Sequence, residues 1–178
     1  MFKAEILNKA AVDRTLVRMA HEIIEKNNGA DNLMLVGIYR RGVSLAKRLA
    51  ANIEASEGVR VPLGMLDITH YRDDLTMISD EPASKKTEFP ESPKGKTVIL
   101  VDDVLYTGRT ARAAMEAVIK EGRPDAIRLA VLVDRGHREL PIRGDFVGKN
   151  LPTSKNEIVK VCIDEYDSKT CVELHDAK

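Results

Sequence analysis

The sequence predicts an α/β fold: a doubly wound, mostly parallel sheet with helices on both faces. Short apolar runs, such as residues 33–38 and 98–101, are typical of strands that are buried on both faces. Helical patterns with a single apolar face follow these runs, and this alternation is typical of parallel sheets. Polar residues stand directly after several of the expected strands, which is where such sheets bind ligands.

Size and composition are those of an ordinary globular protein. The 178 residues are enough for one domain with a sizeable core, so we expect a single domain over residues 1–178. Apolar residues make up 43% of the chain, and 28 basic residues balance 28 acidic ones, so any polyanion site must be a local patch. Two cysteines form no disulfide framework, and we expect buried, reduced thiols.

No segment of the sequence has the pattern of a signal peptide or of a membrane span. The N-terminus lacks a basic stretch followed by an apolar one, and no apolar run approaches the ~20 residues that cross a bilayer. We therefore expect a cytoplasmic protein without membrane contact.

The first part of the chain is expected to alternate regularly. After a short entry segment we expect a helix with apolar positions from residue 11 to 24, a buried strand over 33–38, a helix with its apolar face over 43–53, and a strand over 61–69. The first helix should stop at Asn27-Asn28-Gly29, since Asn and Gly favour helix ends.

Residues 70–96 interrupt this pattern with a polar stretch that contains proline. A segment of this length inside a compact domain is usually functional or mobile. We interpret it as a flexible lid over the functional site, and the alternative is an inert excursion.

The second part of the chain resumes the alternation. We expect a strand over 98–101, a helix with its apolar face over 111–119, a strand over 126–133, a loop rich in basic residues that continues to residue 155, and two short strands over 158–163 and 170–174.

The most informative stretch is the end of the strand over 98–101. It leads into Asp102 and Asp103, and then into Thr107-Gly108-Arg109-Thr110 at the start of a helix. Backbone N–H groups and threonine hydroxyls at a helix start can surround a phosphate, and a carboxylate pair can accept hydrogen bonds from sugar hydroxyls. The alternative for the two aspartates is a structural capping pair or a metal site. The adjacent Thr-Gly loop favours a phosphorylated sugar as the ligand.

Two further strand ends carry cations. Arg40-Arg41-Gly42 follows the strand over 33–38, and Asp134-Arg135-Gly136 follows the strand over 126–133. Cations at a helix start are disfavoured by the helix dipole, so the first pair favours a bound anion, although exposed arginines are common there. A ribose with phosphate groups at both ends would suit these three strand ends.

Residues 98–110 resemble the phosphoribosyl pyrophosphate (PRPP) motif of the type I phosphoribosyltransferases. Residues 66–74, 133–143 and 148–150 resemble the branch of this family that combines uracil phosphoribosyltransferase activity with regulation of pyrimidine operons. The resemblance runs nearly end to end. It implies the type I phosphoribosyltransferase fold, with a flexible lid at about 70–96 and a small hood.

The resemblance also implies roles for individual residues. Asp102 and Asp103 would bind the ribose hydroxyls and are the candidate catalytic residues. The 5′-phosphate would be bound by Val104, Leu105, Tyr106, Thr107, Gly108, Arg109 and Thr110; the pyrophosphate by Arg40, Arg41 and Gly42; Tyr71 and Arg72 would belong to the lid; and Arg135 and Val159 would contact the nucleotide or its base. Mg²⁺ would arrive with PRPP rather than in a protein cage.

The implied reaction joins uracil to the ribosyl group of PRPP, giving UMP and diphosphate. The implied second activity is binding of a hairpin in pyrimidine-operon leader mRNA, controlled by UMP or UTP, through Arg18, His21, Arg138, Arg143 and Lys149. The alternative for these five residues is a solvated helix face and loop. A homodimer or a higher homo-oligomer is expected.

Two other functions stay open at this point. The chain could be a nucleotide-sensing RNA-binding regulator with little transferase activity. It could also be a transferase for a purine or orotate, which only the resemblance of residues 133–143 argues against.

Overall fold

The computed structural model describes residues 1–71 and 87–177 of the chain. Its largest feature is a five-stranded parallel sheet of strand order β3-β2-β4-β5-β6. The strands are β2 (Leu33–Ile38), β3 (Leu63–Leu66), β4 (Thr97–Leu105), β5 (Ala126–Asp134) and β6 (Phe146–Asn150). The predicted parallel α/β sheet is confirmed.

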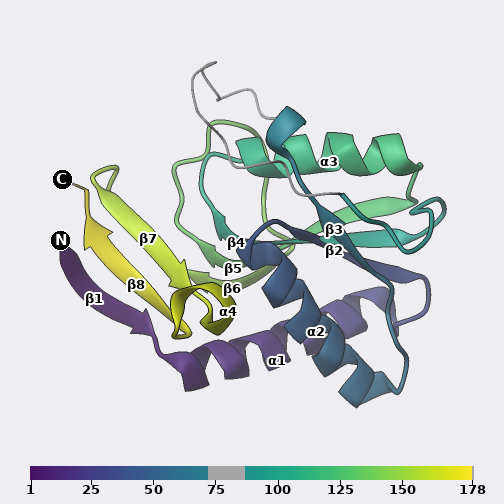
Figure 1. Ribbon diagram of the computed structural model, residues 1–178, viewed down its shortest axis with the longest axis horizontal. Coiled ribbons are helices and arrows are strands. Elements are labelled where there is room, and N and C mark those ends of the chain that lie inside the picture. Colours follow the sequence, from purple (N-terminus) through teal and green to yellow (C-terminus); the bar gives the residue numbers. More distant parts are fainter. Residues whose placement is uncertain (72–86, 178) are drawn as a thin grey trace.

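Three helices cover the sheet. Helices α1 (Lys9–Asn27) and α2 (Arg41–Glu57) lie on one face, and α3 (Arg109–Glu121) lies on the other (Figure 1). Because both faces are covered, all six residues of β2 are buried, as its unbroken apolar sequence predicts. Two apolar clusters result, one between the sheet and α1 and α2, the other between the sheet and α3.

Helix ends follow the local sequence. The Asn8 side chain caps α1 by accepting a hydrogen bond from the N–H of Ala11 at 2.9 Å. The same helix ends at Asn28 in the left-handed conformation, which asparagine tolerates well. The predicted stop is therefore confirmed.

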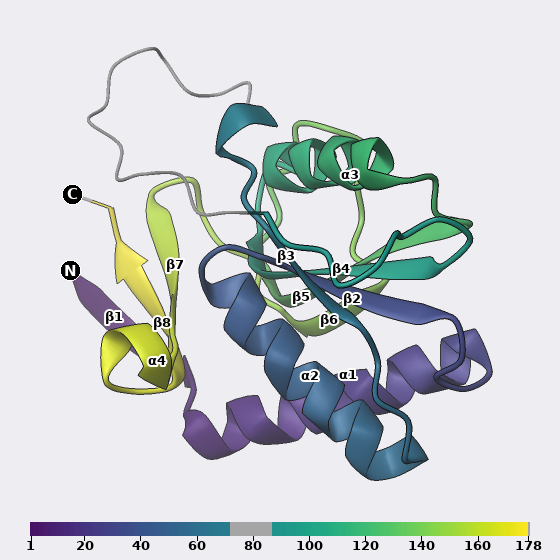
Figure 2. The same ribbon diagram turned by 45° about the vertical axis from the view of Figure 1, so that its right-hand side comes forward.

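A second, smaller sheet lies beyond the carboxyl ends of the parallel strands, and we call it the hood. Its strands β1 (Phe2–Leu7), β8 (Cys171–Asp176) and β7 (Glu157–Cys162) are antiparallel, in the order β1-β8-β7. The short helix α4 (Asp164–Asp167) connects β7 to β8. Figures 1 and 2 show the hood set apart from the main sheet, with both chain termini on it. The predicted small hood is present.

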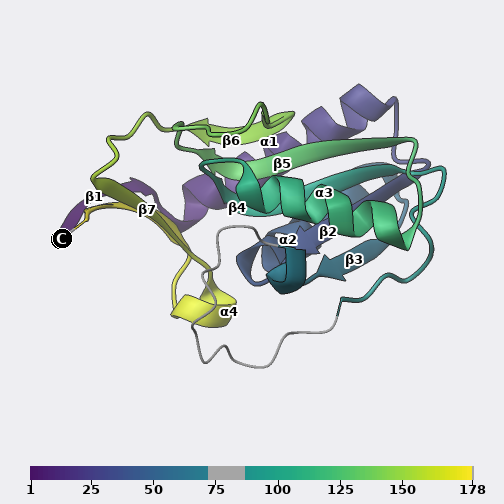
Figure 3. The same ribbon diagram turned by 90° about the horizontal axis from the view of Figure 1, so that it is seen from above.

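Two strands were not predicted. The expected entry segment is β1, which pairs with β8, and part of the expected basic loop is β6, which pairs with β5 at the sheet edge. Charged or polar residues interrupt the apolar pattern within both strands, so pairing with a neighbour decides their structure. In Figure 3, β6 lies beside α1.

Most of the predicted lid falls on residues 72–86. This range, which includes Arg72, lies outside the described residues. On either side of it, Thr69–Tyr71 form a single 3-10 turn, and Glu88 pairs with Met65 of β3 through two backbone hydrogen bonds of 2.8 Å. Residues 87–90 therefore lie against the edge of the main sheet.

Within the described residues, none of the helices has the length and apolarity needed to cross a membrane.

Candidate active site

The two predicted aspartates lie near the end of β4, the central strand of the main sheet. The Asp102 carboxylate accepts a hydrogen bond from the N–H of Asp103, and the Asp103 carboxylate accepts one from the N–H of Val104, both at 2.9 Å. These bonds hold both side chains at the strand end, and an ionised carboxylate has further lone pairs for a ligand.

Asp102 and Asp103 line two different cavities. Asp102 lines a cavity of about 330 Å³ together with residues 104–111, Leu129, Val131 and Glu139. Asp103 lines a cavity of about 700 Å³ together with Arg41 and residues of the hood, among them Val159, Lys160 and His175. Neighbouring residues of a strand point to opposite sides of the sheet. Consecutive residues of β4 therefore line cavities on opposite sides of this strand.

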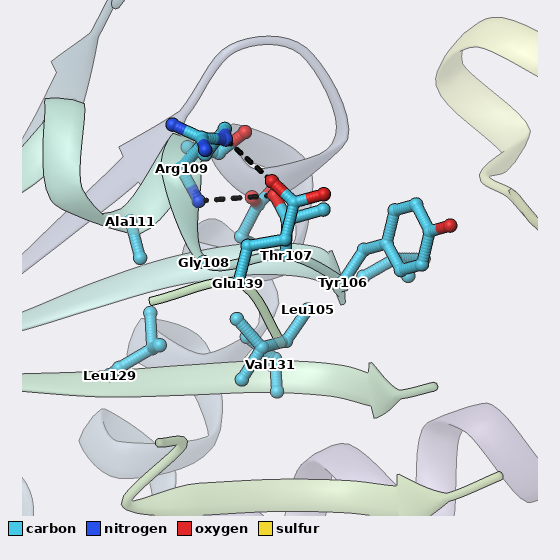
Figure 4. Close-up of a pocket in the computed structure, with 12 residues that line it drawn as sticks. Leu105, Tyr106, Thr107, Gly108, Arg109, Ala111, Leu129, Val131 and Glu139 are labelled. Atoms are coloured by element: carbon cyan, nitrogen blue, oxygen red, sulfur yellow. Dashed lines mark hydrogen bonds and ion pairs between the residues drawn. The ribbon is translucent and has the colours of Figure 1, made fainter. Parts of the chain in front are cut away.

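The β4–α3 loop, residues 106–108, forms one wall of the smaller cavity (Figure 4). Gly108 caps α3 in a left-handed conformation with φ of 94° and carries no capping side chain. The Thr107 hydroxyl accepts a bond from the N–H of Arg109 at 3.3 Å. The start of α3 can stabilise an anion through its N–H groups and the helix dipole.

The segment between β5 and β6 holds this loop in place. The N–H groups of Glu139 and Leu140 donate to the Thr107 carbonyl at 2.9 and 3.2 Å. The Glu139 carboxylate pairs with Arg109 Nε at 2.8 Å, as the dashed line in Figure 4 shows. Arg138 donates to the Tyr106 carbonyl at 2.6 Å and to the Asp134 carboxylate at 2.6 Å.

The turn between β2 and α2 presses against β4. A Cβ atom on Gly42 would lie 2.4 Å from the Val101 carbonyl oxygen, so only glycine fits here. This close approach brings Arg41, the first residue of α2, to the cavity that Asp103 lines. Arg40 is exposed, with its guanidinium carbon 6.0 Å from the Tyr166 ring centroid.

Arg41 is tied to the hood by a two-point ion pair. Its Nε and Nη2 donate to the two carboxylate oxygens of Asp167 at 3.1 and 2.8 Å. This pairing lowers the pKa of Asp167 and raises the pKa of Arg41, while burial opposes both shifts. Both groups are therefore charged across the physiological range.

Arg135 and Tyr71, two further predicted site residues, lie outside the two cavities. The buried Arg135 guanidinium stacks on the Tyr106 ring, 4.0 Å from its centroid, and Nη2 donates to the Ser154 carbonyl at 3.2 Å. Tyr71 contacts α3: its carbonyl accepts a bond from Arg112 at 3.2 Å, and Lys120 Nζ lies 4.6 Å from its ring centroid. Neither residue is among those that line the two cavities in the described part of the chain.

Comparison with known proteins identifies the family. The family model of the phosphoribosyl transferase domain matches residues 3–166. The chain is 60% identical to the bifunctional protein PyrR of Clostridium novyi, covering 97% of both chains. It is also 60% identical to that of Thermus aquaticus, covering 97% of this chain and 96% of the relative. The chain belongs to the PyrR family of phosphoribosyltransferases.

Solved structures confirm the fold of this PyrR-family chain. A hypoxanthine phosphoribosyltransferase of Trypanosoma cruzi superposes with a TM-score of 0.73 at 16% identity, covering 99% of this chain and 98% of the other. The corresponding enzyme of Staphylococcus aureus gives a TM-score of 0.72 at 18% identity, covering 97% and 92%. These structures confirm the predicted type I phosphoribosyltransferase fold. The family match and the curated relatives confirm the predicted enzyme class, a phosphoribosyltransferase.

The residues that the family resemblance connects with RNA lie on three elements. Arg18 and His21 are exposed on α1, Lys149 is exposed on β6, and Arg143 is exposed on the loop before β6. Arg18 Nη2 donates to the Gly148 carbonyl at 2.5 Å, which joins the α1 and β6 positions. Arg138, on the segment between β5 and β6, contacts the β4–α3 loop through the Tyr106 carbonyl.

Sequence reasoning missed two residues that the site contains. Glu139 pairs with Arg109 across 30 residues, and Asp167 pairs with Arg41 across 126. Asp167 stood in an expected turn, where an acidic residue needs no special explanation. No local signal in the sequence connects either acid with its arginine.

Proposed function

We propose that this chain transfers the ribosyl group of PRPP to uracil, giving UMP and diphosphate. The observation that carries the proposal is the pair of neighbouring carboxylates on β4, each lining a different cavity. One cavity ends at the start of α3, which suits a 5′-phosphate. The other contains Arg41, which suits a pyrophosphate, and faces the hood, where Val159 would contact the base. The ribose would lie between them, on Asp102 and Asp103.

Binding and orientation would supply most of the rate. As the bond from C1′ to pyrophosphate breaks, positive charge develops on the ribose, close to Asp102 and Asp103. Negative charge develops on the pyrophosphate, close to Arg41. Preorganised charges at these two positions stabilise the transition state without any covalent intermediate on the protein.

Mg²⁺ fits this arrangement as a partner of the substrate. Among residues 1–71 and 87–177, no group of three His, Cys, Asp or Glu side chains is arranged to hold a metal ion. Asp102 and Asp103 would hydrogen-bond the ribose hydroxyls, and Mg²⁺ would be held by oxygen atoms of the substrate and by water rather than by a protein cage. Bound in this way, the ion would neutralise part of the charge on the departing pyrophosphate.

Replacing Asp103 by Asn tests the transferase. The change keeps the shape of the side chain and removes its charge, so UMP formation from uracil and PRPP should fall by more than about a hundredfold. Asp31→Asn, on the exposed turn before β2, is the matched control and should keep full activity. Circular dichroism verifies the fold of both variants. Turnover at the wild-type rate in Asp103→Asn would refute the assignment.

Uracil as the acceptor base has its own test. Wild-type protein should form product with uracil and not with hypoxanthine, guanine or orotate under the same conditions. Preferred turnover of a purine or of orotate would replace uracil in the proposal while keeping the transferase.

We also propose a regulatory role, the binding of a pyrimidine-operon leader hairpin in the presence of UMP or UTP. The exposed positions Arg18, His21, Arg143 and Lys149 supply phosphate contacts near β6. Arg138 supports a dependence of RNA binding on the nucleotide. It donates a hydrogen bond to the Tyr106 carbonyl in the β4–α3 loop and belongs to the same segment as Arg143, so it connects the phosphate loop with an RNA-binding position. A ligand at this loop can change RNA affinity only if it favours one arrangement of that segment.

The RNA role is tested with Arg143→Ala in filter binding of the leader hairpin, with and without UMP. Affinity should fall, and the slope of log affinity against log salt should decrease by about 0.7 to 0.9 for one lost phosphate contact. Arg123→Ala, at the exposed turn before β5, is the control and should leave both unchanged. UMP-stimulated RNA binding together with negligible UMP synthesis would favour the sensor without strong transferase activity.

Three further expectations remain predictions: a lid over residues 70–96, a homodimer or larger homo-oligomer, and a cytoplasmic location. Light scattering after size exclusion measures the assembly directly. A monomer at micromolar concentration would contradict the expected oligomer.

A further inference from the structure

Each of the four residues of α4 faces a basic side chain, which comes from α1, from α2 or from Arg40, the residue directly before α2. Asp164 pairs with Lys9 at 2.6 Å, and Glu165 pairs with Arg48 at 2.9 Å. Tyr166 lies under Arg40, and Asp167 holds Arg41. In Figures 1 and 3, α4 lies between the hood strands and the first turn of α2. The hood is therefore attached to α1, to α2 and to the turn before α2 by three ion pairs and one cation–aromatic contact.

The Asp167–Arg41 pair differs from the other pairs of α4 because it is partly buried and fixed at several points. The side chain of Asp167 is 16% exposed and that of Arg41 31%, against 47% for Glu165. Asp167 Oδ2 also accepts a bond from the N–H of Ile163 at 2.9 Å, which fixes the carboxylate itself. A fixed carboxylate that binds two nitrogens of a guanidinium fixes the plane of that guanidinium.

Arg41 keeps donors for a ligand in this arrangement. A guanidinium has five N–H donors, of which Asp167 uses one on Nε and one on Nη2. Within the described part of the chain, the Nη1 donors and the second Nη2 donor are left, in a side chain that lines the cavity shared with Asp103.

We propose that Asp167 is a positioning residue, which holds Arg41 so that its remaining donors meet the departing pyrophosphate beside Asp103. This inference rests on the proposed ribosyl transfer. An arginine side chain is flexible, and holding it before substrate arrives removes the ordering that the transition state would otherwise require. The same contact makes the orientation of Arg41 depend on the docking of the hood.

The opposite role is physically possible and gives the opposite result. If Asp167 only sequestered Arg41, its carboxylate would compete with pyrophosphate, and removing its charge would tighten binding of the anion. The direction of the change therefore decides between positioning and sequestration.

The test compares Asp167→Asn with Glu165→Gln, a matched loss of one α4 carboxylate that leaves Arg41 paired. For Asp167→Asn we expect kcat for UMP formation to fall roughly tenfold to a hundredfold, with the KM for uracil unchanged. Calorimetry with inorganic pyrophosphate and Mg²⁺ should show weaker binding. Glu165→Gln should match the wild type in both measurements, and Asp167→Glu should recover part of kcat.

A double-mutant cycle separates positioning from a general structural effect. Adding Asp167→Asn to Arg41→Lys should cost little beyond Arg41→Lys alone, because Asp167 acts through the guanidinium. Additive losses, an equal loss in Glu165→Gln, or tighter pyrophosphate binding in Asp167→Asn would each overturn the inference. Pyrophosphate binding is measured without any transfer step, so a failure of the proposed uracil reaction is seen separately, as absent UMP synthesis in the wild type.

Discussion

At the scale of the residue, one glycine sets the distance between Arg41 and the carboxylates of β4. Gly42 lets the β2–α2 turn rest on the Val101 carbonyl, and that contact places Arg41 beside Asp103. Gly42 was expected in the pyrophosphate loop from family resemblance alone. The structure supplies the physical reason, which is the lack of space for a Cβ atom.

Gly42→Ala should therefore weaken both the fold and the site. The added methyl group must push α2 away from β4, and such overpacking typically costs about 1–3 kcal/mol. We expect a lower melting temperature and a raised KM for PRPP. Ala51→Ser adds one heavy atom on the exposed side of the same helix and serves as the control in both measurements.

Glu173 gives the hood a pH dependence. This buried carboxylate on β8 pairs with Lys169 and His175, and pairing with Lys169 above all lowers its pKa from 4.5 to about 2. A lowered pKa in the folded state stabilises the fold above pH 4.5, and this contribution is lost as the pH falls from 4.5 towards 2. Lys169 is half exposed, so solvent screening reduces this contribution.

Urea unfolding of Glu173→Gln measures this contribution. The variant should be less stable than the wild type at pH 6, and the difference should shrink towards pH 2.5. A difference that stays constant over this range would show that packing, and not charge, makes Glu173 stabilising.

At the scale of the element, the sequence predicted those strands and helices whose own pattern determines their structure. The unbroken apolar run of β2 and the single apolar face of α3 are examples. β6 (Phe146–Asn150) was missed because its sequence, FVGKN, has only two apolar side chains. Its glycine, Gly148, is required because a Cβ atom there would lie 2.5 Å from the Leu132 carbonyl oxygen. Such a strand is defined by its neighbour.

The other missed strand, β1, should matter for the hood. It covers one edge of β8, and Lys3 pairs with Glu157 of β7 across the sheet. Deleting residues 1–7 should speed amide hydrogen exchange in β8 by more than about tenfold, since β8 would become an edge strand. Amides of β4 in the same sample are the control and should keep their protection. Unchanged exchange in β8 would show that the hood is held by α4 and α1 alone.

At the scale of the whole molecule, the site is formed where the main sheet, α3 and the hood meet, and shared apolar clusters join these three parts. The main sheet supplies the carboxylates, α3 supplies the helix start, and the hood lines the larger cavity. Sequence reasoning found the first two because residues 98–110 are continuous. It could not place the hood, because the contacts of α4 with α1 and α2 join residues more than a hundred positions apart.

A ligand that bridges these parts should stabilise the entire fold. UMP at a hundred times its dissociation constant should add about 2.7 kcal/mol, which corresponds to a rise of roughly 5–10 °C in melting temperature for a chain of this size. Calorimetric melting with and without UMP measures this rise. Asp103→Asn should show a much smaller rise at the same concentration, whereas an equal rise would place the nucleotide away from Asp103.

The alternation of Asp102 and Asp103 along β4 makes the chemistry depend on strand register. A shift of β4 by one residue against β2 and β5 would move each of its side chains to the opposite face of the sheet. The two carboxylates would then face the wrong cavities, and the apolar side chains before them would leave their places in the core. Inserting or deleting a single residue between Thr97 and Asp102 is therefore a different kind of change from substituting any one of them. Evolution can alter the side chains of this strand one by one, but it cannot alter their number without dismantling the site.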